Sequence, residues 1–210
     1  MVKVTQIQMD YMKNPAGLVK LPQFSWMIDG EGERCCRQQA YQLQLARMPE
    51  APGAPKVIVY DSGMIKSGES AHVLLTEGTL TLEPARKYYV RVRVLTKSDS
   101  GPGDTGFSDW SWFVTGLTEP LQWTGDFVSA ESSGDYGKFN ATLIRGSFEV
   151  QGKIREAYAY TTALGVYKYY LNGSRVGTDE MAPGWTSYNK RLMYQTWDIK
   201  KYLLQGENIL

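Results

Sequence analysis

The residues best suited to contact a ligand lie in one stretch near the C-terminal end of the chain. Two aromatic residues, Trp185 and Tyr188, stand in the loop sequence Pro-Gly-Trp-Thr-Ser-Tyr. Aromatic rings can stack on the C–H face of a sugar ring, so this loop is a candidate carbohydrate platform. Aromatic side chains also supply much of the buried area in β-sandwiches, and both rings could fill the interior instead.

Four side chains that carry oxygen atoms flank this loop: Asn172, Asp179, Glu180 and Asn189. Their oxygens could bind sugar hydroxyls, and Asp179 with Glu180 could hold Ca²⁺, a hard cation that prefers oxygen ligands. The spacing does not match the oxygen-ligand pattern of a calcium-binding loop. The alternative is that Asn172 serves a turn and that the acidic side chains are solvated.

The chemistry of catalysis is not evident in the sequence. A glycosidase needs two carboxyl groups that flank the scissile bond, and the acidic residues here are scattered. There is no Ser/His/Asp set, phosphate-binding glycine loop or Cys/His zinc cluster. The single histidine, His72, has no nearby ligand residues, and the adjacent Cys35 and Cys36 are poorly placed for a disulfide. We therefore predict no cofactor, with Ca²⁺ as the one candidate.

A hairpin must position the candidate ligand residues, because the residues before them alternate as in a strand. Tyr167, Tyr169 and Leu171 fall on one face at period two. Asn172-Gly173 then supplies two residues that tolerate positive φ, as a type I′ turn requires. Residues 174–177 are expected to return as the partner strand.

The rest of this second block, from residue 123 onward, also reads as short strands rather than helices. The expected strands are 127–128, 146–150, 156–162, 166–171 and 192–199. Pro183-Gly184 is a turn signal between the last two of them. Asp198 is expected to cap a short turn over 199–204, which Gly206 ends.

The first block, about residues 1–115, has the strand and turn pattern of a sandwich. We expect Trp26 in its core and strands over 24–28, 41–45, 57–60 and 88–94. The pattern Leu82-x-Pro84-x-x-x-Tyr88 predicts a tyrosine corner. Residues 98–106 are rich in Gly, Pro, Asp and Ser, which predicts a loop before the strand that Phe107 opens.

Two arginines in this block are expected on the outside of the sandwich. Arg91 and Arg93 alternate with the valines at 90, 92 and 94, so they face away from the core. The run Phe107-Ser-Asp-Trp110-Ser supplies aromatic rings nearby. We predict a cation–π stack of these arginines on Phe107 and Trp110, a structural feature under any function.

Composition sets limits on the class of protein. With 210 residues the chain can form one large domain or two small ones. Its net charge of +1 gives no electrostatic footprint for nucleic acid or an anionic membrane. No apolar run approaches the roughly 20 residues of a transmembrane helix. The first residues lack the apolar core of a signal peptide. A chain from which a signal peptide had been removed would look the same, so the cellular compartment stays open.

Several segments resemble the N-terminal accessory region of bacterial α-L-rhamnosidases. In the second block these are Leu-Asn-Gly-Ser-Arg-Val-Gly, Ala-Pro-Gly-Trp-Thr-Ser-Tyr-Asn-Lys-Arg, Tyr-Gln-Thr-Trp-Asp-Ile and Gly-Glu-Asn. In the first block they are Tyr-Asp-Ser-Gly, Tyr-Tyr-Val-Arg-Val-Arg-Val and Ser-x-Trp-Ser. The Asn-Gly and Gly-Glu-Asn segments also occur in β-galactosidase-like hydrolases, whereas Pro-Gly-Trp-Thr-x-Tyr favours the rhamnosidases.

The resemblance implies an all-β chain with two domains. A fibronectin type III or Ig-like sandwich would cover residues 1–116, and an incomplete jelly-roll, carbohydrate-binding-like sandwich would cover 117–210. The chain would be a non-catalytic part of a glycoside hydrolase that releases terminal α-L-rhamnose, inactive alone. Its partners would be a rhamnose-containing carbohydrate and a downstream catalytic domain, with no nucleic acid and no membrane. The bacterial parent would be cytoplasmic, or exported after signal removal.

Two other readings stay open at this point. One is a non-enzymatic carbohydrate-binding or adhesion protein, and the other is the accessory region of a β-galactosidase-like hydrolase. A half-complete jelly roll would also expose strand edges and apolar side chains, so we expect self-association. The side chains expected on that surface are Trp197, Leu203, Leu204, Ile209 and Leu210.

Overall fold

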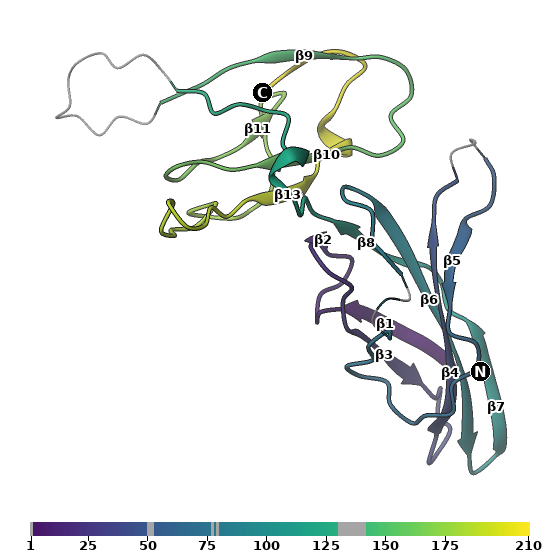
Figure 1. Ribbon diagram of the computed structural model, residues 1–210. Helices are drawn as coiled ribbons and strands as arrows, with labels where there is room; N and C mark the ends of the chain where they lie inside the picture. The colour runs from purple at the N-terminus through teal and green to yellow at the C-terminus, as the bar shows by residue number, and fades with distance from the viewer. Residues whose placement is uncertain (1, 50–52, 77, 79, 130–141) are drawn as a thin grey trace. The chain divides into compact units, whose positions relative to one another are not determined.

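The computed structural model describes residues 2–49, 53–76, 78, 80–129 and 142–210. Strands dominate it and its only helices are two short 3₁₀ turns within these residues, which confirms the all-β prediction (Figure 1). No helix in these ranges is long and apolar enough to cross a membrane. The chain forms two compact units, Met1–Thr118 and Glu119–Leu210.

The first unit is a sandwich of two sheets. Its larger sheet has six strands: β2 (Ala16–Leu18), β8 (Ser111–Thr115), β6 (Lys87–Ser98), β4 (Arg37–Arg47) and β5 (Val57–Asp61) in that order, with β7 (Gly101–Phe107) also paired to β6. Apart from the parallel β2–β8 pair, neighbours in this sheet run antiparallel. The smaller sheet pairs β1 (Lys3–Met9) with β3 (Phe24–Asp29).

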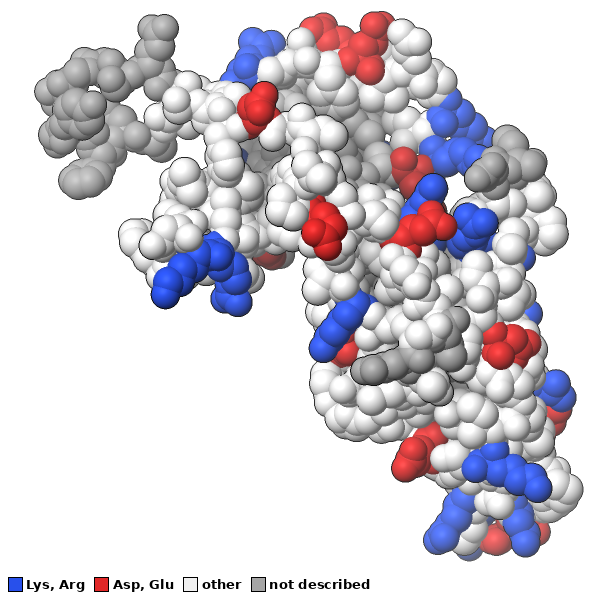
Figure 2. All heavy atoms as spheres, viewed as in Figure 1, with Lys and Arg blue, Asp and Glu red and all other residues white. Residues whose placement is uncertain are grey.

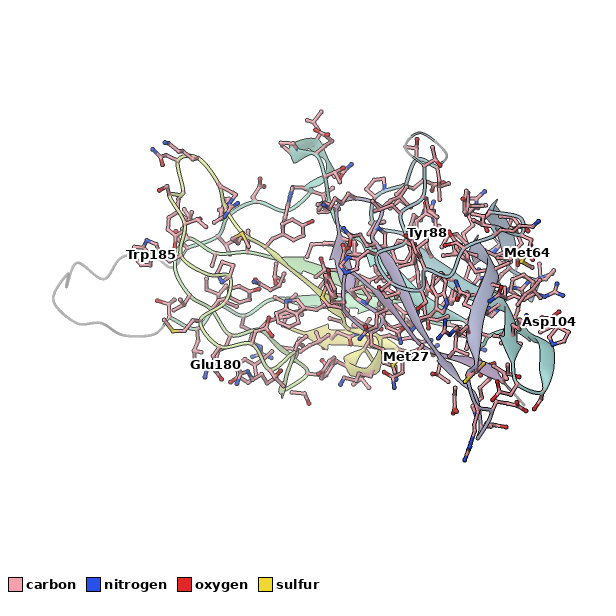
Figure 3. All side chains as sticks on the ribbon, turned by 90° about the horizontal axis from the view of Figure 1, so that it is seen from below. Met27, Met64, Tyr88, Asp104, Glu180 and Trp185 are labelled. Carbon is pink, nitrogen blue, oxygen red and sulfur yellow. The ribbon has the colours of Figure 1, made fainter. Side chains whose placement is uncertain are left out.

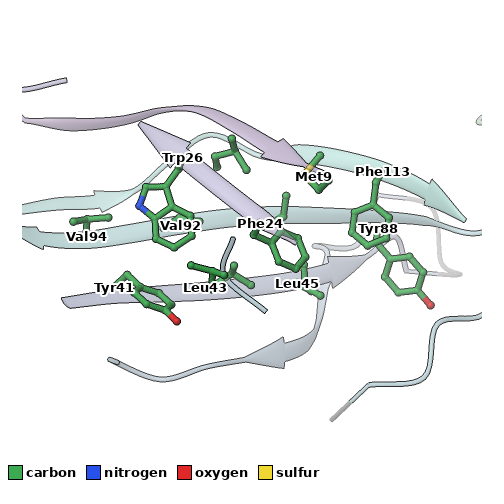
Figure 4. Packing of buried hydrophobic residues seen from close by; sticks show 13 residues of the cluster. Met9, Phe24, Trp26, Tyr41, Leu43, Leu45, Tyr88, Val92, Val94 and Phe113 are labelled. Carbon is green, nitrogen blue, oxygen red and sulfur yellow. The ribbon is translucent and has the colours of Figure 1, made fainter. Parts of the chain in front are cut away.

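The core of this unit lies between the two sheets, where the inward side of each strand meets the other (Figure 4). Strand β6 alternates buried and half-buried residues along its length, the pattern of a strand with one face on the core. Trp26 is buried in β3, as predicted. The buried cluster consists of Ile7, Met9, Phe24, Trp26, Tyr41, Leu43, Leu45, Val73, Tyr88, Val90, Val92, Val94 and Phe113.

One buried polar pair ties a long connection to this core. The indole Nε1 of Trp26 donates to Oε1 of Gln38 at 3.0 Å. The amide nitrogen of Gln38 donates in turn to the carbonyls of Ser67, at 3.0 Å, and Glu69, at 2.6 Å. Because buried amides are costly without partners, this set of bonds holds the segment after β5 against β3.

The predicted tyrosine corner is present. Tyr88 is buried, and its hydroxyl accepts a hydrogen bond from the backbone N–H of Glu83 at 2.9 Å. The ring of Tyr88 stacks on Phe113, with centroids 5.4 Å apart and planes 17° apart. The corner thereby fixes the chain just before it enters β6.

The predicted loop over residues 98–106 is wrong, because most of it forms strand β7. This strand lies next to β6, and Pro102 is tolerated where it does not have to donate a ladder hydrogen bond. Side-chain hydroxyls complete the pairing where the register shifts. Thr105 Oγ1 accepts from the N–H of Val94 at 2.9 Å, and Ser108 Oγ accepts from that of Val92 at 3.1 Å.

The outer face of β6 carries a stack of alternating cations and rings. The guanidinium of Arg91 lies 4.2 Å from the Phe107 ring centroid and 4.4 Å from that of Trp110, as predicted. Lys56 and Lys87 extend the stack over Tyr89, Trp110 and Trp112. Arg93 instead forms an ion pair with Asp104, whose pKa it lowers by hydrogen bonding.

The second unit contains three two-stranded antiparallel sheets within the described residues. They pair β9 (Ser147–Val150) with β14 (Gly206–Ile209), β10 (Tyr158–Thr161) with β13 (Gln195–Asp198), and β11 (Tyr170–Leu171) with β12 (Ser174–Arg175). The 3₁₀ turns are η1 (Pro120–Gln122) and η2 (Lys200–Tyr202). A cluster of Leu171, Val176 and Ile199, flanked by half-buried side chains, forms its interior.

Several predictions for this unit need correction. Residues 127–128 are exposed and form no strand. The strands expected over 166–171 and 192–199 shrink to β11 and β13, and the N–H of Tyr167 donates instead to the carbonyl of Ala182. Asp198 does accept a hydrogen bond from Lys200 N–H at 3.2 Å, next to the start of η2. Gly206 is the first residue of β14.

We predict that Tyr88→Phe destabilises the first unit by about 1–3 kcal/mol, because the N–H of Glu83 loses its partner. Urea unfolding of the full chain, followed by hydrogen exchange on β6 and β8, measures the change. Tyr11→Phe is the control, since that hydroxyl is on an exposed residue and its loss should change stability by less than about 0.5 kcal/mol. Equal effects of the two substitutions would contradict the corner's role.

Candidate functional site

The hairpin at the base of the candidate site has the predicted turn. Leu171 pairs with Ser174, so Asn172 and Gly173 are the two loop residues between β11 and β12. Their φ angles are 50° and 76°, which is the requirement of a type I′ turn. The two-residue hairpin is therefore confirmed.

The Asn172 side chain is engaged inside the unit. Its Nδ2 donates to the carbonyl of Tyr202 at 2.9 Å and to Oδ1 of Asn208 at 2.8 Å. Its Oδ1 accepts from the N–H of Ile209 at 2.9 Å. These bonds join the turn to η2 and β14, so the contacts of Asn172 in this structure are structural.

Asn208 is the partner whose role the sequence reasoning missed. It is fully buried, and its Nδ2 donates to the carbonyls of Leu204, at 2.8 Å, and Gly206, at 2.9 Å. Its Oδ1 also accepts from Leu204 N–H at 2.8 Å. The signal was available, because Asn208 belongs to the Gly-Glu-Asn segment that recurs together with Asn-Gly.

The loop that carries Trp185 is anchored at its start. Ala182 and Pro183 are buried, and the carbonyl of Ala182 accepts from Tyr167 N–H at 2.9 Å. The carbonyl of Pro183 accepts from Gln195 Nε2 at 3.3 Å. Trp185, two residues on, is 88% exposed, and its ring projects from the loop (Figure 3). The structure thus presents this ring to solvent on a fixed base.

A chain of side-chain hydrogen bonds supports that anchor. Trp197 Nε1 donates to Thr161 Oγ1 at 2.7 Å, and that hydroxyl lies 2.5 Å from the Tyr167 hydroxyl. Tyr167 donates to Oε1 of Gln195 at 2.9 Å. Because Gln195 holds the carbonyl of Pro183, half-buried side chains of β10 and β13 are linked to the start of the exposed loop.

The two aromatic residues of the loop differ in their surroundings. Their ring centroids are 6.1 Å apart, with planes 35° apart. Tyr188 is half-buried, and its hydroxyl is enclosed without a hydrogen-bond partner among the residues that the structure describes. Tyr188 thus packs under the loop, as the interior-filling alternative expects, while Trp185 has the exposure of a platform.

The acidic candidates lie beside cations. Glu180 Oε1 is 2.7 Å from Arg175 Nη1, and its other oxygen is 3.4 Å from Lys168 Nζ. The hydrogen bond from Arg175 lowers the pKa of Glu180. Asp179 is exposed, and its carbonyl accepts from Arg175 at 2.6 Å. In the described ranges no three His, Cys, Asp or Glu side chains gather as metal ligands.

Asn189 is exposed at the far side of the loop. The loop backbone next to it is closed by the carbonyl of Ser187, which accepts from the N–H groups of Lys190, at 2.8 Å, and Arg191, at 3.0 Å. Charged side chains of both signs are scattered over the face shown in Figure 2. The site is therefore an exposed ring with polar neighbours rather than an enclosed catalytic cleft.

Comparison with known proteins assigns both units. The family model of the Rha78A-like, N-terminal immunoglobulin domain matches residues 4–119. The family model of the α-L-rhamnosidase N-terminal domain matches residues 152–210. The two matches follow each other along the chain in the order of the two compact units.

Individual relatives agree with these matches. An α-L-rhamnosidase from Alteromonas sp. (strain LOR) is 30% identical over 205 residues, which is 94% of this chain and 22% of that protein. The structure of an α-L-rhamnosidase from Dictyoglumus thermophilum has a TM-score of 0.76 and 27% identity, over 99% of this chain and 24% of its own. That of an enzyme from Aspergillus terreus, named α-L-rhamnosidase, has a TM-score of 0.71 and 28% identity, over 100% and 23%. The chain spans about a fifth of the length of the curated relatives it matches.

Alanine substitutions at Gly177 and Gly173 test how tightly the chain packs against Trp197. A Cβ added to Gly177 would lie 1.9 Å from the Trp197 ring, whereas one added to Gly173 meets nothing within 4 Å. Both glycines have positive φ, so Ala costs about 1–2 kcal/mol at either. We predict that Gly177→Ala costs roughly 1–3 kcal/mol more than Gly173→Ala. Thermal unfolding with hydrogen exchange on β10 and β13 measures both, and equal losses would contradict the packing argument.

Proposed function

We propose that this chain is the non-catalytic N-terminal portion of an α-L-rhamnosidase. The chain belongs to the Rha78A-like N-terminal immunoglobulin domain family. The observation that carries the proposal is the pair of family matches, one on each unit and in order. The whole protein would release terminal α-L-rhamnose from a rhamnose-containing carbohydrate. Its catalytic domain would lie downstream of this chain and would be this chain's main partner.

The carboxyl groups whose pKa is clearly shifted fit a role without catalysis. The general acid of a glycosidase needs a raised pKa so that it holds a proton near neutral pH. Hydrogen-bond donors here instead lower the pKa of Glu31, Glu33, Asp104 and Glu180. The pKa of Asp61 is lowered too, since burial, which acts to raise it, is outweighed by bonds from Gln42 and Gln44. These groups resemble structural carboxylates.

The exposed ring of Trp185 supports a second element of the proposal, a sugar contact. The ring offers an apolar face to solvent, and the hydrogen bonds at Ala182 and Pro183 hold the start of its loop in place. A ring on a fixed base loses less conformational freedom when a ligand binds. The polar groups that would complete the contact are the exposed side chains of Asn189 and Asp179.

Adding a nitrophenyl α-L-rhamnoside and then a rhamnose-containing oligosaccharide to the purified chain tests both elements. We expect no release of nitrophenol and a change in tryptophan fluorescence that Trp185→Ala abolishes. Tyr170→Ala, which removes another exposed aromatic ring of the same unit, should leave the change intact. Hydrolysis that copurifies with the chain would overturn the non-catalytic role. A fluorescence change that survives Trp185→Ala would remove the sugar contact and leave a scaffold.

The second unit is also proposed to self-associate. Leu204 and Leu210 are exposed as expected, but Trp197 and Leu203 pack against the interior cluster and Ile209 is half-buried. The sheets described in this unit have two strands each, so outer strand edges can pair with another copy.

Light scattering over a range of chain concentrations tests this association. We expect the weight-average mass of the chain to rise with concentration, while a chain ending at Thr118 stays monomeric. Leu204→Lys should weaken the association, since it places a charge on the apolar surface, and the exposed Val19→Lys change in the first unit is its matched control. A strictly monomeric chain at all concentrations would contradict the proposal.

A further inference from the structure

Asn172-Gly173 is the only Asn-Gly pair in the sequence. This pair is chemically reactive, because glycine has no side chain to keep its backbone nitrogen away from the preceding side chain. The Gly173 nitrogen attacks Cγ of Asn172, a C–N bond closes a succinimide ring, and the side-chain nitrogen leaves as ammonia. Water then opens the ring to aspartate or isoaspartate, and no other reagent is needed.

We propose that Asn172 is a deamidation site whose reaction the folded second unit holds back, so that its modification marks chains in which this unit has opened. The attack requires the Asn172 side chain to turn toward its own Gly173 nitrogen. In the folded unit three hydrogen bonds oppose that rotation, those to Tyr202, Asn208 and Ile209.

The leaving nitrogen, Nδ2 of Asn172, is restrained by two hydrogen bonds in the folded unit. Asn172 Nδ2 donates to two acceptors, the carbonyl of Tyr202 and Oδ1 of Asn208, and the second of these belongs to a fully buried residue. The backbone of Asn172 is held too, because its N–H donates to the carbonyl of Ile209 at 2.8 Å. The reaction therefore has to wait for local opening of the turn, and its rate follows the opened fraction.

The product cannot restore the closed arrangement. An aspartate or isoaspartate at position 172 has only acceptors, and it would face the carbonyl of Tyr202 and Oδ1 of Asn208. Asn208 cannot turn its amide to compensate without losing its bonds to Leu204 and Gly206. Isoaspartate also lengthens the backbone of a two-residue turn. A modified chain thus keeps a weakened second unit, which makes the change a one-way record of opening.

Mass spectrometry of the tryptic peptide 169–175 measures the reaction. The full chain is incubated at mildly alkaline pH in native buffer and in concentrated urea. We expect deamidation of Asn172 in urea and a rate at least roughly tenfold lower in native buffer, since closed regions react through rare openings. Asn189, which precedes lysine and is exposed, is the internal control and should react slowly under both conditions.

Two substitutions test separately the hydrogen bonds that protect Asn172 and the effect of its product. Asn208→Ala removes one acceptor of the amide nitrogen, so the native rate should rise toward the rate in urea. Asn172→Asp imitates the product and should increase hydrogen exchange in β11, β12 and β14 without affecting the first unit. If Asn208→Ala unfolds the second unit, the comparison of native and urea rates for the unsubstituted chain still decides.

Three results would overturn the proposal. Equal rates in native buffer and urea would show that the fold gives no protection. The absence of deamidation at Asn172 in urea would show that the site is not reactive. Unchanged exchange in Asn172→Asp would show that the modified chain closes normally and keeps no record.

Discussion

The second unit depends on one hydrogen-bonded pair of amides, the half-buried Asn172 and the fully buried Asn208. Within the described residues its apolar cluster has three buried side chains, Leu171, Val176 and Ile199, which by themselves leave much freedom in how the hairpin, η2 and β14 meet. The amide pair removes that freedom, since each hydrogen bond has a direction as well as a length. A buried polar network stabilises a unique arrangement only when its members are satisfied, and the amide atoms of both side chains have partners here.

The first unit reaches the same specificity by a different route. Its core is a continuous apolar layer between two sheets, so packing alone sets most of the geometry. Its polar contacts lie in the places where the alternation of side chains along a strand does not determine the structure. Gln38 fastens the connection after β5, the Tyr88 hydroxyl fastens the entry to β6, and hydroxyls of Thr105 and Ser108 bridge the shifted register beside β6. Each of them satisfies backbone groups that a simple sheet would leave open.

The parts of this structure that could be predicted are those in which a sequence pattern is compatible with one local structure only. Strict alternation identified β6 and the side of β3 that holds Trp26, and the tolerance of Asn172-Gly173 for positive φ identified the turn. Strand β7 was missed because Gly, Pro, Asp and Ser are typical of loops, while its pairing comes from β6 rather than from its own propensity. The strand predicted over residues 127–128 is absent, because apolar residues alone do not supply a strand to pair with.

The same distinction applies to the candidate site, where burial rather than residue type separates Trp185 from Tyr188. Both are aromatic and three positions apart, so the sequence alone offers either ring as a platform or as a core residue. The outcome depends on the start of the loop, where Tyr167 and Gln195 hold the carbonyls of Ala182 and Pro183. Trp197 and Thr161 hold Tyr167 in turn, and Trp197 lies against Gly177, where no side chain larger than hydrogen fits. A glycine with no chemistry of its own therefore helps to determine how the exposed tryptophan is presented.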